Sequence, residues 1–504
     1  MTIHFINQCL QVTLRTAGAA VCALTLVSAC TVLGPEYEEP VADVQDEWSG
    51  IETAALNSNP PLDSQWWKTA FNDPVLDALV ETALEQNLSL RSAALRVMQA
   101  QQQLAIAMGN RYPQSQTMTG EAQTSTTNLG TDELYNLGFN LSWELDFWGR
   151  YTLAIRSASA QFDASMADYD GVIVSLLANV AQNYMTIRTL EQRMEVAQLN
   201  LKLQQNSQQI TTAKFNAGAV SALDVDQAET LVYNTTATLS LFEQSLQQTK
   251  NSLAILLGRV PQDMNGLLTD VRPIPSSFPE VAVGMPQELI RRRPDIRIAE
   301  RQLAAQGAQI GIAMNELYPQ FQIGGSIGTG AQDDFSDLFS TGSYTLNLFG
   351  HFQWNLFNYG RLRSNIRYQD AVFQQLLADY RSTVLQAEGE VENAIVAYLK
   401  SQEQLVAYQK ATNAAQRAAD ISSLQYKDGL VSFNTVISTL QSLQSQQDLL
   451  ASTQGAVANN LVQVYKSLGG GWEIREGKAS SELLPESVKE EMLERSKYWK
   501  KVFE

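Results

Sequence analysis

Cysteine and histidine are almost absent from this 504-residue sequence. The cysteines are Cys9, Cys22 and Cys30, and the histidines are His4 and His351. After Cys30 no thiol can form a disulfide or hold zinc, and one imidazole cannot build a histidine metal cluster. The sequence therefore predicts no metal site, and it offers almost no material for catalysis through cysteine or histidine.

Proline is also missing over long stretches. None occurs between Pro113 and Pro261, and none between Pro319 and Pro485. Proline fixes φ and removes a backbone donor, so its absence permits helices much longer than the globular average. We expect an elongated protein.

Positive charge is scarce, since the formal net charge is −18 and the sequence pI is about 4.7. This excess of acid argues against nucleic-acid binding, which needs a basic surface. An acidic wall would favour cations or cationic solutes. Solubility alone explains the composition equally well.

No long apolar run follows Cys30, so the sequence predicts no membrane-spanning helix. The first residues read instead as a secretory signal, with Arg15 before a short apolar run that ends in Val27-Ser28-Ala29-Cys30. This ending resembles a bacterial lipobox, which implies cleavage after residue 29 and acylation of Cys30. Thr31 favours delivery to the outer membrane. The alternative is an ordinary signal with an incidental cysteine.

A direct repeat organises the rest of the chain. From Arg150 the sequence matches itself at an offset of 211 residues (361 − 150) over a long stretch without a gap. The Gly149-Arg150 pair, for example, recurs as Gly360-Arg361. Because turn residues are included, the match predicts two copies of one structural unit.

Each copy contains two segments in which apolar and polar residues alternate, the pattern of a β-strand. The expected strands are residues 117–127, 135–144, 321–328 and 344–354, with hairpin loops at 128–130 and 332–337. Tyr135, Trp143, Tyr344 and Trp354 stand at strand ends, where membrane barrels carry interfacial aromatic girdles. A soluble sheet with one solvent-exposed face would show the same alternation.

Four strands are too few for a membrane pore, because the smallest barrels have about eight strands. Several chains must therefore contribute if these strands cross a bilayer. Two chains would supply eight strands and three would supply twelve.

Long helices follow the strands of each copy. Residues 151–215 and 222–257 are the expected pair in the first copy, and leucines at heptad spacing predict coiling with a neighbouring helix. The second copy has the same seam, interrupted by Gln447 and Gln454. This thin seam suits the wall of a helical tube, although an elongated structural coiled coil remains an alternative.

The turns between the long helices are marked by a glycine that permits a left-handed cap and a serine that starts the next helix. They should form the tips most distant from the strands, where a gate or a partner would act. The tip residues are Gly218, Val220 and Ser221 in the first copy and Gly429, Val431 and Ser432 in the second.

Several motifs in this order resemble the outer membrane factors of tripartite efflux systems, in particular NodT-type lipoproteins similar to OprM and, more distantly, TolC. The motifs are Trp66-Trp67, Phe71-Asn72-Asp73-Pro74, Tyr112-Pro113, Tyr318-Pro319, the stretch from Arg292 to Arg297, and two Trp-x-Leu boxes ending in Gly-Arg.

The resemblance implies an α+β fold in which a trimer forms a twelve-stranded outer-membrane β-barrel, continued by a long periplasmic α-helical barrel. It also implies a homotrimer that contacts outer membrane lipids, a periplasmic adaptor protein and an inner-membrane resistance-nodulation-division pump. Drugs or other toxic compounds would be exported, with no cofactor and no enzymatic reaction. The expected location is the outer membrane, with a lipid anchor and an extension into the periplasm.

Relatives of this kind carry carboxylates near the tips that constrict the pore. Asp224 matches that pattern in the first copy, with Asp226 close by, whereas the corresponding positions of the second copy are Thr435 and Ser438. The resemblance thus implies a weak electrostatic gate carried mainly by Asp224. Alternatively, Asp224 stabilises the helix start by facing its positive end.

The predicted organisation is a signal at 1–29, a lipid-anchored segment at 30–75, the first repeat at 76–258, a linker at 259–284, the second repeat at 285–469 and a charged tail at 470–504, loose or helical and without an evident function. Two further readings stay open: the outer component of a one-step (type I) protein secretion system, and a lipid-anchored periplasmic coiled-coil scaffold.

Overall fold

The computed structural model describes residues 32–41, 44, 48, 56–57, 64–128, 130–262, 268, 271–275, 281–282 and 292–503. The predicted signal at 1–29, Cys30 and much of the predicted linker lie outside these residues. The chain forms two compact units, which we call the sheet unit (1–41, 97–165 and 298–381) and the tip unit (42–96, 166–297 and 382–504). Among the described residues, no helix combines the length and the apolar character that crossing a membrane requires.

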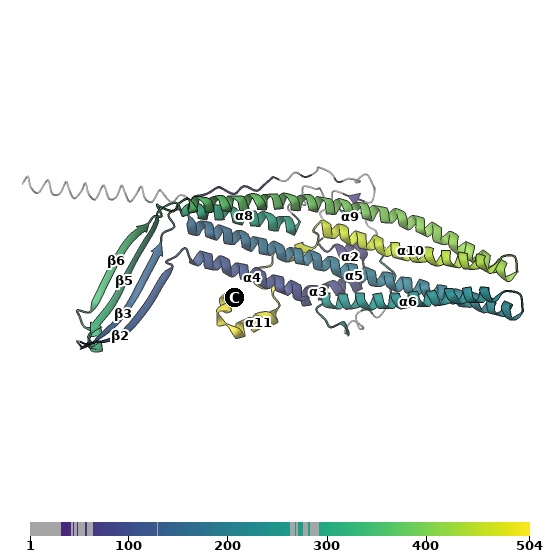
Figure 1. Ribbon diagram of the computed structural model, residues 1–504, viewed down its shortest axis with the longest axis horizontal. Helices are drawn as coiled ribbons and strands as arrows, with labels where there is room; N and C mark the ends of the chain where they lie inside the picture. The colour runs from purple at the N-terminus through teal and green to yellow at the C-terminus, as the bar shows by residue number, and fades with distance from the viewer. Residues whose placement is uncertain are drawn as a thin grey trace, which may run out of the picture. The chain divides into compact units, whose positions relative to one another are not determined.

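The sheet unit contains the four predicted strands, side by side in the order β2-β3-β5-β6 (Figure 1). The strands are β2 (Ser115–Thr127), β3 (Gly130–Glu144), β5 (Gln320–Gln332) and β6 (Tyr344–Gln353). All neighbours are antiparallel. β3 starts five residues before the predicted strand, so the first hairpin loop is shorter than expected. The loop between β5 and β6 includes a 3-10 turn, η2 (Phe335–Phe339).

The register gives the sheet one apolar face. Phe139 lies opposite Met118 on one side and Ile327 on the other, and Ile327 lies opposite Leu346. Because side chains alternate along a strand, these residues share a face. Residues such as Asn140 and Ser326, which are also directly opposite, occupy the other face.

Each repeat holds its strands to the preceding helix through the tryptophan of its Trp-x-Leu box. Trp143 Nε1 donates to the carbonyl of Arg111 at 3.2 Å, and Trp354 Nε1 donates to that of Leu317 at 2.9 Å. Both carbonyls come just before a Tyr-Pro pair, at the ends of α4 (Leu88–Gly109) and α8 (Pro294–Asn315). The repeated motif therefore has the same contact in both copies.

The predicted long helices are present and almost unbroken. They are α5 (Arg150–Asn216) and α6 (Ala222–Leu256) in the first copy, and α9 (Arg361–Lys427) and α10 (Phe433–Ser467) in the second. In the predicted seam of α10, Leu443, Val457 and Leu461 are fully buried, whereas Leu450 is half-buried.

The glutamines that interrupt the seam of α10 are partners in a polar ladder with α5. Gln454 Oε1 accepts from Gln192 Nε2 at 2.7 Å, and Gln447 Oε1 accepts from Asn200 Nδ2 at 2.7 Å. Arg193 forms an ion pair with Asp448 between these two rungs. Asn200 is buried and the three glutamines are half-buried. Because amides removed from water need hydrogen-bond partners, the ladder favours one alignment of the two helices.

The start of the tip unit packs on the same helices. In α2 (Trp66–Phe71), Trp66 stacks on Tyr465 of α10 with ring centroids 4.9 Å apart. Asp73, the N-cap of α3 (Pro74–Gln86), accepts a hydrogen bond from Tyr184 of α5 at 2.5 Å. Burial and this hydrogen bond raise the pKa of Tyr184 to about 12, so the phenol keeps its proton.

The charged C-terminal tail is not loose. It forms short helices, including η3 (Trp472–Arg475) and α11 (Glu486–Arg495), and buries Trp472, Leu484 and Met492. The fully buried carboxylate of Asp170 in α5 binds Arg475 and also accepts from Arg297 Nη1 at 3.0 Å. This shared ion pair holds the tail, and the sequence spacing gives no sign of it.

Gly455 shows how closely α10 packs on α5. A Cβ built at Gly455 would lie 2.0 Å from Thr189 Oγ1 and 2.9 Å from Thr189 Cβ. We predict that Gly455→Ala lowers the free energy of unfolding by about 1–3 kcal/mol, because overpacking outweighs the gain in helix propensity of roughly 1 kcal/mol. Urea unfolding followed by circular dichroism in detergent measures this.

Gly171→Ala is the matched control in the same unit. Its Cβ would meet only Pro294 Cβ, at an ordinary 3.5 Å. Stability should then be unchanged or rise by up to about 1 kcal/mol. Equal destabilisation by both alanines would contradict the packing argument.

Candidate functional site

The predicted tips are two similar helix-to-helix turns in the tip unit. Gly218 and Gly429 have φ values of 70° and 76°, the left-handed conformation that glycine adopts without strain. Each turn closes with a hydrogen bond typical of a helix end, from Ala219 N to the Lys214 carbonyl at 2.9 Å and from Leu430 N to the Gln425 carbonyl at 2.8 Å. Ser221 and Ser432 are the N-caps of α6 and α10, as predicted.

Asp224 turns back onto its own helix start. Its carboxylate accepts from Ser221 N at 3.1 Å and from Ser221 Oγ at 3.2 Å, which is half of a capping box. The side chain remains half-exposed, and Asp226 is exposed. Asp224 therefore caps the helix while its charge stays at the surface.

The second copy replaces this charged cap with hydroxyl groups. Thr435 Oγ1 lies 3.3 Å from Ser432 Oγ, and Ser438 Oγ donates to the Thr435 carbonyl at 2.9 Å. Both side chains are exposed. The two tips thus have the same backbone and different charge.

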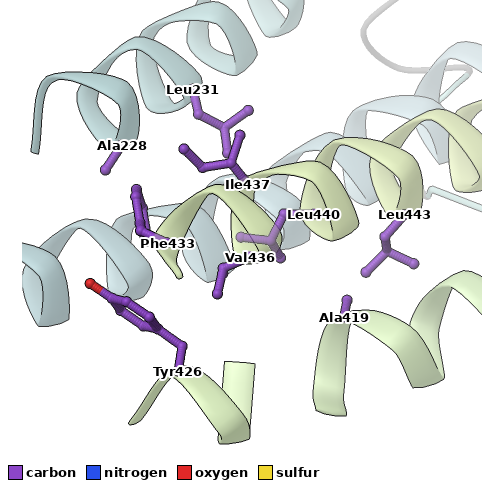
Figure 2. Close-up of a cluster of buried hydrophobic side chains, with 9 residues drawn as sticks. All are labelled: Ala228, Leu231, Ala419, Tyr426, Phe433, Val436, Ile437, Leu440 and Leu443. Carbon is purple, nitrogen blue, oxygen red and sulfur yellow. The ribbon is translucent and has the colours of Figure 1, made fainter. Parts of the chain in front are cut away.

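A buried cluster joins the tips of α6, α9 and α10 (Figure 2). We call it the tip cluster; its members are Ala228, Leu231, Ala419, Tyr426, Phe433, Val436, Ile437, Leu440 and Leu443. Val431 packs against it from the second turn. Packing between the two helix pairs thus continues up to the turns.

Lys214 of α5 reaches across to the end of α9. Its Nζ donates to the Tyr426 carbonyl at 2.5 Å and lies 4.1 Å from the centroid of the Tyr426 ring. Tyr426 in turn packs on Phe433, with centroids 5.3 Å apart. This contact links the first and second copies at the tips.

No role at the tips was predicted from the sequence for Lys214, Tyr426 or Phe433. Comparison of the repeats contains the signal, because Tyr426 corresponds to Phe215, and Phe433 to Ala222. Phe215 is exposed whereas Tyr426 is buried. Differences between the copies therefore mark the positions where one tip packs against the other.

The four aromatic residues predicted at strand ends differ in their surroundings. Trp143 and Trp354 bind the helix ends described above. Tyr135 lies within β3 and not at its end, because β3 begins at Gly130. It donates to Glu133 Oε2 at 2.6 Å and contacts the ring of Phe335, whereas Tyr344 begins β6 and is exposed.

The tip cluster gives a stability test. Phe433→Ala should destabilise the tip by about 3–5 kcal/mol, since it empties a well-packed site. Leu430→Ala removes an exposed side chain from the adjacent turn and should change stability by less than about 0.5 kcal/mol. Hydrogen exchange of the tip amides measures both, and equal protection in the two variants would rule out the cluster as the stabilising contact.

Comparisons with known proteins agree on one family. The profile of the family described as outer membrane efflux protein matches residues 79–259 and 285–470, which are the two repeats. The pyoverdine export outer membrane protein OpmQ of Pseudomonas aeruginosa is 32% identical over 468 residues, covering 89% of this chain and 97% of OpmQ. The solvent efflux pump outer membrane protein SrpC of Pseudomonas putida is 30% identical, covering 90% and 97%.

A solved structure has the same fold along nearly its whole length. The outer-membrane channel OprN superposes with a TM-score of 0.81 at 30% identity, covering 88% of this chain and 99% of OprN. The predicted α+β fold with two repeats and four strands per chain is confirmed. With the profile on both repeats and relatives matched almost end to end, this chain belongs to the outer membrane efflux protein family.

Proposed function

We propose that three copies of this chain form a channel across the outer membrane, through which an efflux pump expels small molecules such as drugs or other toxic compounds. A periplasmic adaptor and an inner-membrane pump of the resistance-nodulation-division type would complete the assembly. The relatives support this class, since one is named for pyoverdine export and another for solvent efflux. The chain itself would catalyse no reaction and bind no cofactor.

One observation carries the proposal: a four-stranded sheet with one apolar and one polar face continues into two pairs of long helices. The apolar face suits lipid and the polar face suits a water-filled lumen. Three chains supply twelve strands, enough for an open barrel. Trp143 and Trp354 would then lie at the membrane interface.

Cys30 would attach the chain to the membrane, and the tip turns would bind the adaptor. Acyl chains on Cys30 would anchor the amino terminus in the outer membrane, since each buried methylene contributes about 0.8 kcal/mol. The exposed glycines Gly218 and Gly429 would present the tips to the adaptor.

We also propose that Asp224 gives the periplasmic entrance its charge. Three copies would place three carboxylates at the tips, with Asp226 adding a further negative field, and negative charge lining a narrow opening favours cations. The hydrogen bonds to Ser221 fix the side chain at the helix start. Thr435 and Ser438 leave the second copy neutral, so the gate would be weaker than one with carboxylates in both copies.

Asp224→Asn separates the charge from the cap, because the amide oxygen can still accept from Ser221 N. We expect cation-over-anion permeability in a planar bilayer to fall by roughly twofold or more, since the field at the opening is lost. Thr435→Asp should have the opposite effect. Ser221→Ala, which removes a hydroxyl but no charge, is the control for helix capping.

If Asp224 serves only as a cap, Asp224→Asn keeps wild-type selectivity. Selectivity lost equally in Ser221→Ala would point to the same conclusion, because that variant alters only the cap.

The channel itself is tested in purified protein and in cells. The protein should form trimers that conduct ions in planar bilayers, and deletion of its gene should sensitise cells to toxic small molecules. If the purified protein does not conduct ions across planar bilayers, a periplasmic scaffold would be favoured instead. A conducting protein whose loss blocks secretion of a protein, with unchanged drug sensitivity, would favour type I secretion.

A further inference from the structure

A hollow lies on the apolar face of the sheet. Its volume is about 590 Å³, and its floor is formed by Gly325 of β5 and Gly350 of β6. The register places Gly325 between Leu141 and Leu348, and Gly350 opposite Ile323, so each glycine has a large apolar neighbour across the ladder. A Cβ built at Gly350 would meet no atom within 4 Å. The floor is therefore open, and no side chain of the described residues fills it.

The hollow suits a hydrocarbon chain. The side chains that border it on this face are aliphatic or aromatic, and an apolar cavity of this kind stays dry and takes apolar guests. It extends from Ile323 to Ile327, roughly 13 Å along the strand at about 3.3 Å per residue. One leaflet is about half of a hydrocarbon core roughly 30 Å thick, so an acyl chain of that length fills the hollow from end to end.

Residues 32–37, which we call the amino-terminal strap, run along α8 in the same unit. A Cβ built at Gly34 would lie 2.7 Å from Gly311 Cα, so the two backbones are in direct contact. Three residues later, the Tyr37 hydroxyl donates to Glu300 Oε1 at 2.5 Å. Because Glu300 is buried, this hydrogen bond and the glycine contact hold the strap on α8.

The strap reaches the base of the sheet at the turn between β3 and α5. Leu33 N donates to the Trp148 carbonyl at 3.1 Å. A Cβ built at Gly149 would lie 3.0 Å from Val32 Cα, so the first described residue of the chain touches this turn. The strap thus begins where the strands give way to the helices.

The turn leads directly to the hollow. Phe147, beside Trp148, contacts the ring of Phe321 with centroids 5.2 Å apart. Phe321 lies on the apolar face, two residues before Ile323 at the end of the hollow nearest the helices. A short aromatic path therefore joins the strap to the hollow.

Cys30 stands two positions before Val32. A chain spans at most about 3.6 Å per residue, so Cys30 is within about 7 Å of Val32. An acyl chain on Cys30 thus starts near the helix end of the hollow.

We propose that one acyl chain carried by Cys30 lies in the hollow between Ile323 and Ile327. The inference rests on the lipid anchor of the proposed function, and it adds the place where the hydrocarbon packs. The strap sets the starting point of the acyl chain, and the two glycines leave room for it. The anchor is then part of the packing of the sheet as well as an attachment to the bilayer.

A photo-reactive residue tests the position of the acyl chain. Leu348 borders the hollow and is 81% exposed, so p-benzoylphenylalanine can replace it. After irradiation of the full-length protein in the outer membrane, trypsin releases the acylated peptide from Cys30 to Lys68, since no lysine or arginine lies between them. We expect mass spectrometry to find this peptide joined, through its acyl chain, to the peptide that contains position 348.

Thr124 is the matched control position. It lies on the same face, near the far end of β2 and away from the hollow. The same photo-reactive residue at Thr124 should give several-fold less of the acylated-peptide adduct. Equal yields at the two positions would mean that the acyl chain has no fixed place on the sheet.

Other adducts at position 348 would also overturn the proposal. Phospholipid or lipopolysaccharide bound there, without the acylated peptide, would mean that bulk lipid fills the hollow. Absence of any lipid adduct would mean that the hollow stays empty. An unacylated Cys30 would remove this inference together with the lipid anchor, whereas conduction by the purified trimers tests the channel independently.

Gly350→Leu tests the hollow by filling it. The new side chain has free space at its Cβ, so trimers and acylation should be retained, while the yield of the position-348 adduct falls several-fold. Thr124→Leu adds the same side chain to the same face outside the hollow and should leave that yield unchanged. Equal yields in the two variants would place the acyl chain elsewhere.

Gly311→Ala tests the strap. Its Cβ would lie 2.6 Å from the Leu33 carbonyl oxygen, so the strap must shift and the adduct should again fall several-fold, with acylation retained. Gly389→Ala, a helical glycine of α9 whose Cβ would meet nothing within 4 Å, is the control. The same adduct yield in both alanine variants would show that the strap does not place the acyl chain.

Discussion

The structure depends on the need of backbone N–H and C=O groups for partners. Within the described residues, the sheet pairs β2, β3, β5 and β6 in an open array, which leaves the outer sides of β2 and β6 without a neighbour. In water such edges would be solvated, but in a bilayer each unpaired group costs several kcal/mol. A chain with this sheet is therefore incomplete as a membrane wall, and assembly is the physical remedy.

Internal duplication makes that assembly simple. The second copy repeats the strand pair and the long helix pair of the first, so one chain supplies four strands and four long helices.

The tip unit solves a different problem, which is to hold four long helices in one register without a thick apolar core. The polar ladder between α5 and α10 aligns the helices because each amide donor must lie opposite an amide acceptor. A shift of one helix along the other would leave these groups without hydrogen-bond partners. At the turns the packing becomes apolar again, through Phe433 and Tyr426. The helices therefore carry polar contacts along their length and are held by apolar packing at the turns.

The sequence alone determined the features that rest on local periodicity and on self-similarity. Alternation set the strands, long proline-free stretches set the helices, and glycine followed by serine set the turns at Gly218 and Gly429 with their left-handed backbones. These are short-range effects, in which each residue acts on the few beside it. The family motifs predicted the fold class, because their order along the chain resembles that of a known family.

Tertiary structure decided the rest, since it concerns residues that only folding brings together. Asp170 and Arg475 are 305 positions apart in the chain. Their spacing therefore did not predict that a buried carboxylate would bind the charged tail. In the sequence, Gln447 and Gln454 only interrupt an apolar seam. In the structure they accept hydrogen bonds from Asn200 and Gln192 of α5. Periodicity says which face of a helix is buried, but the complementary donor or charge on the other side is fixed only by three-dimensional contact.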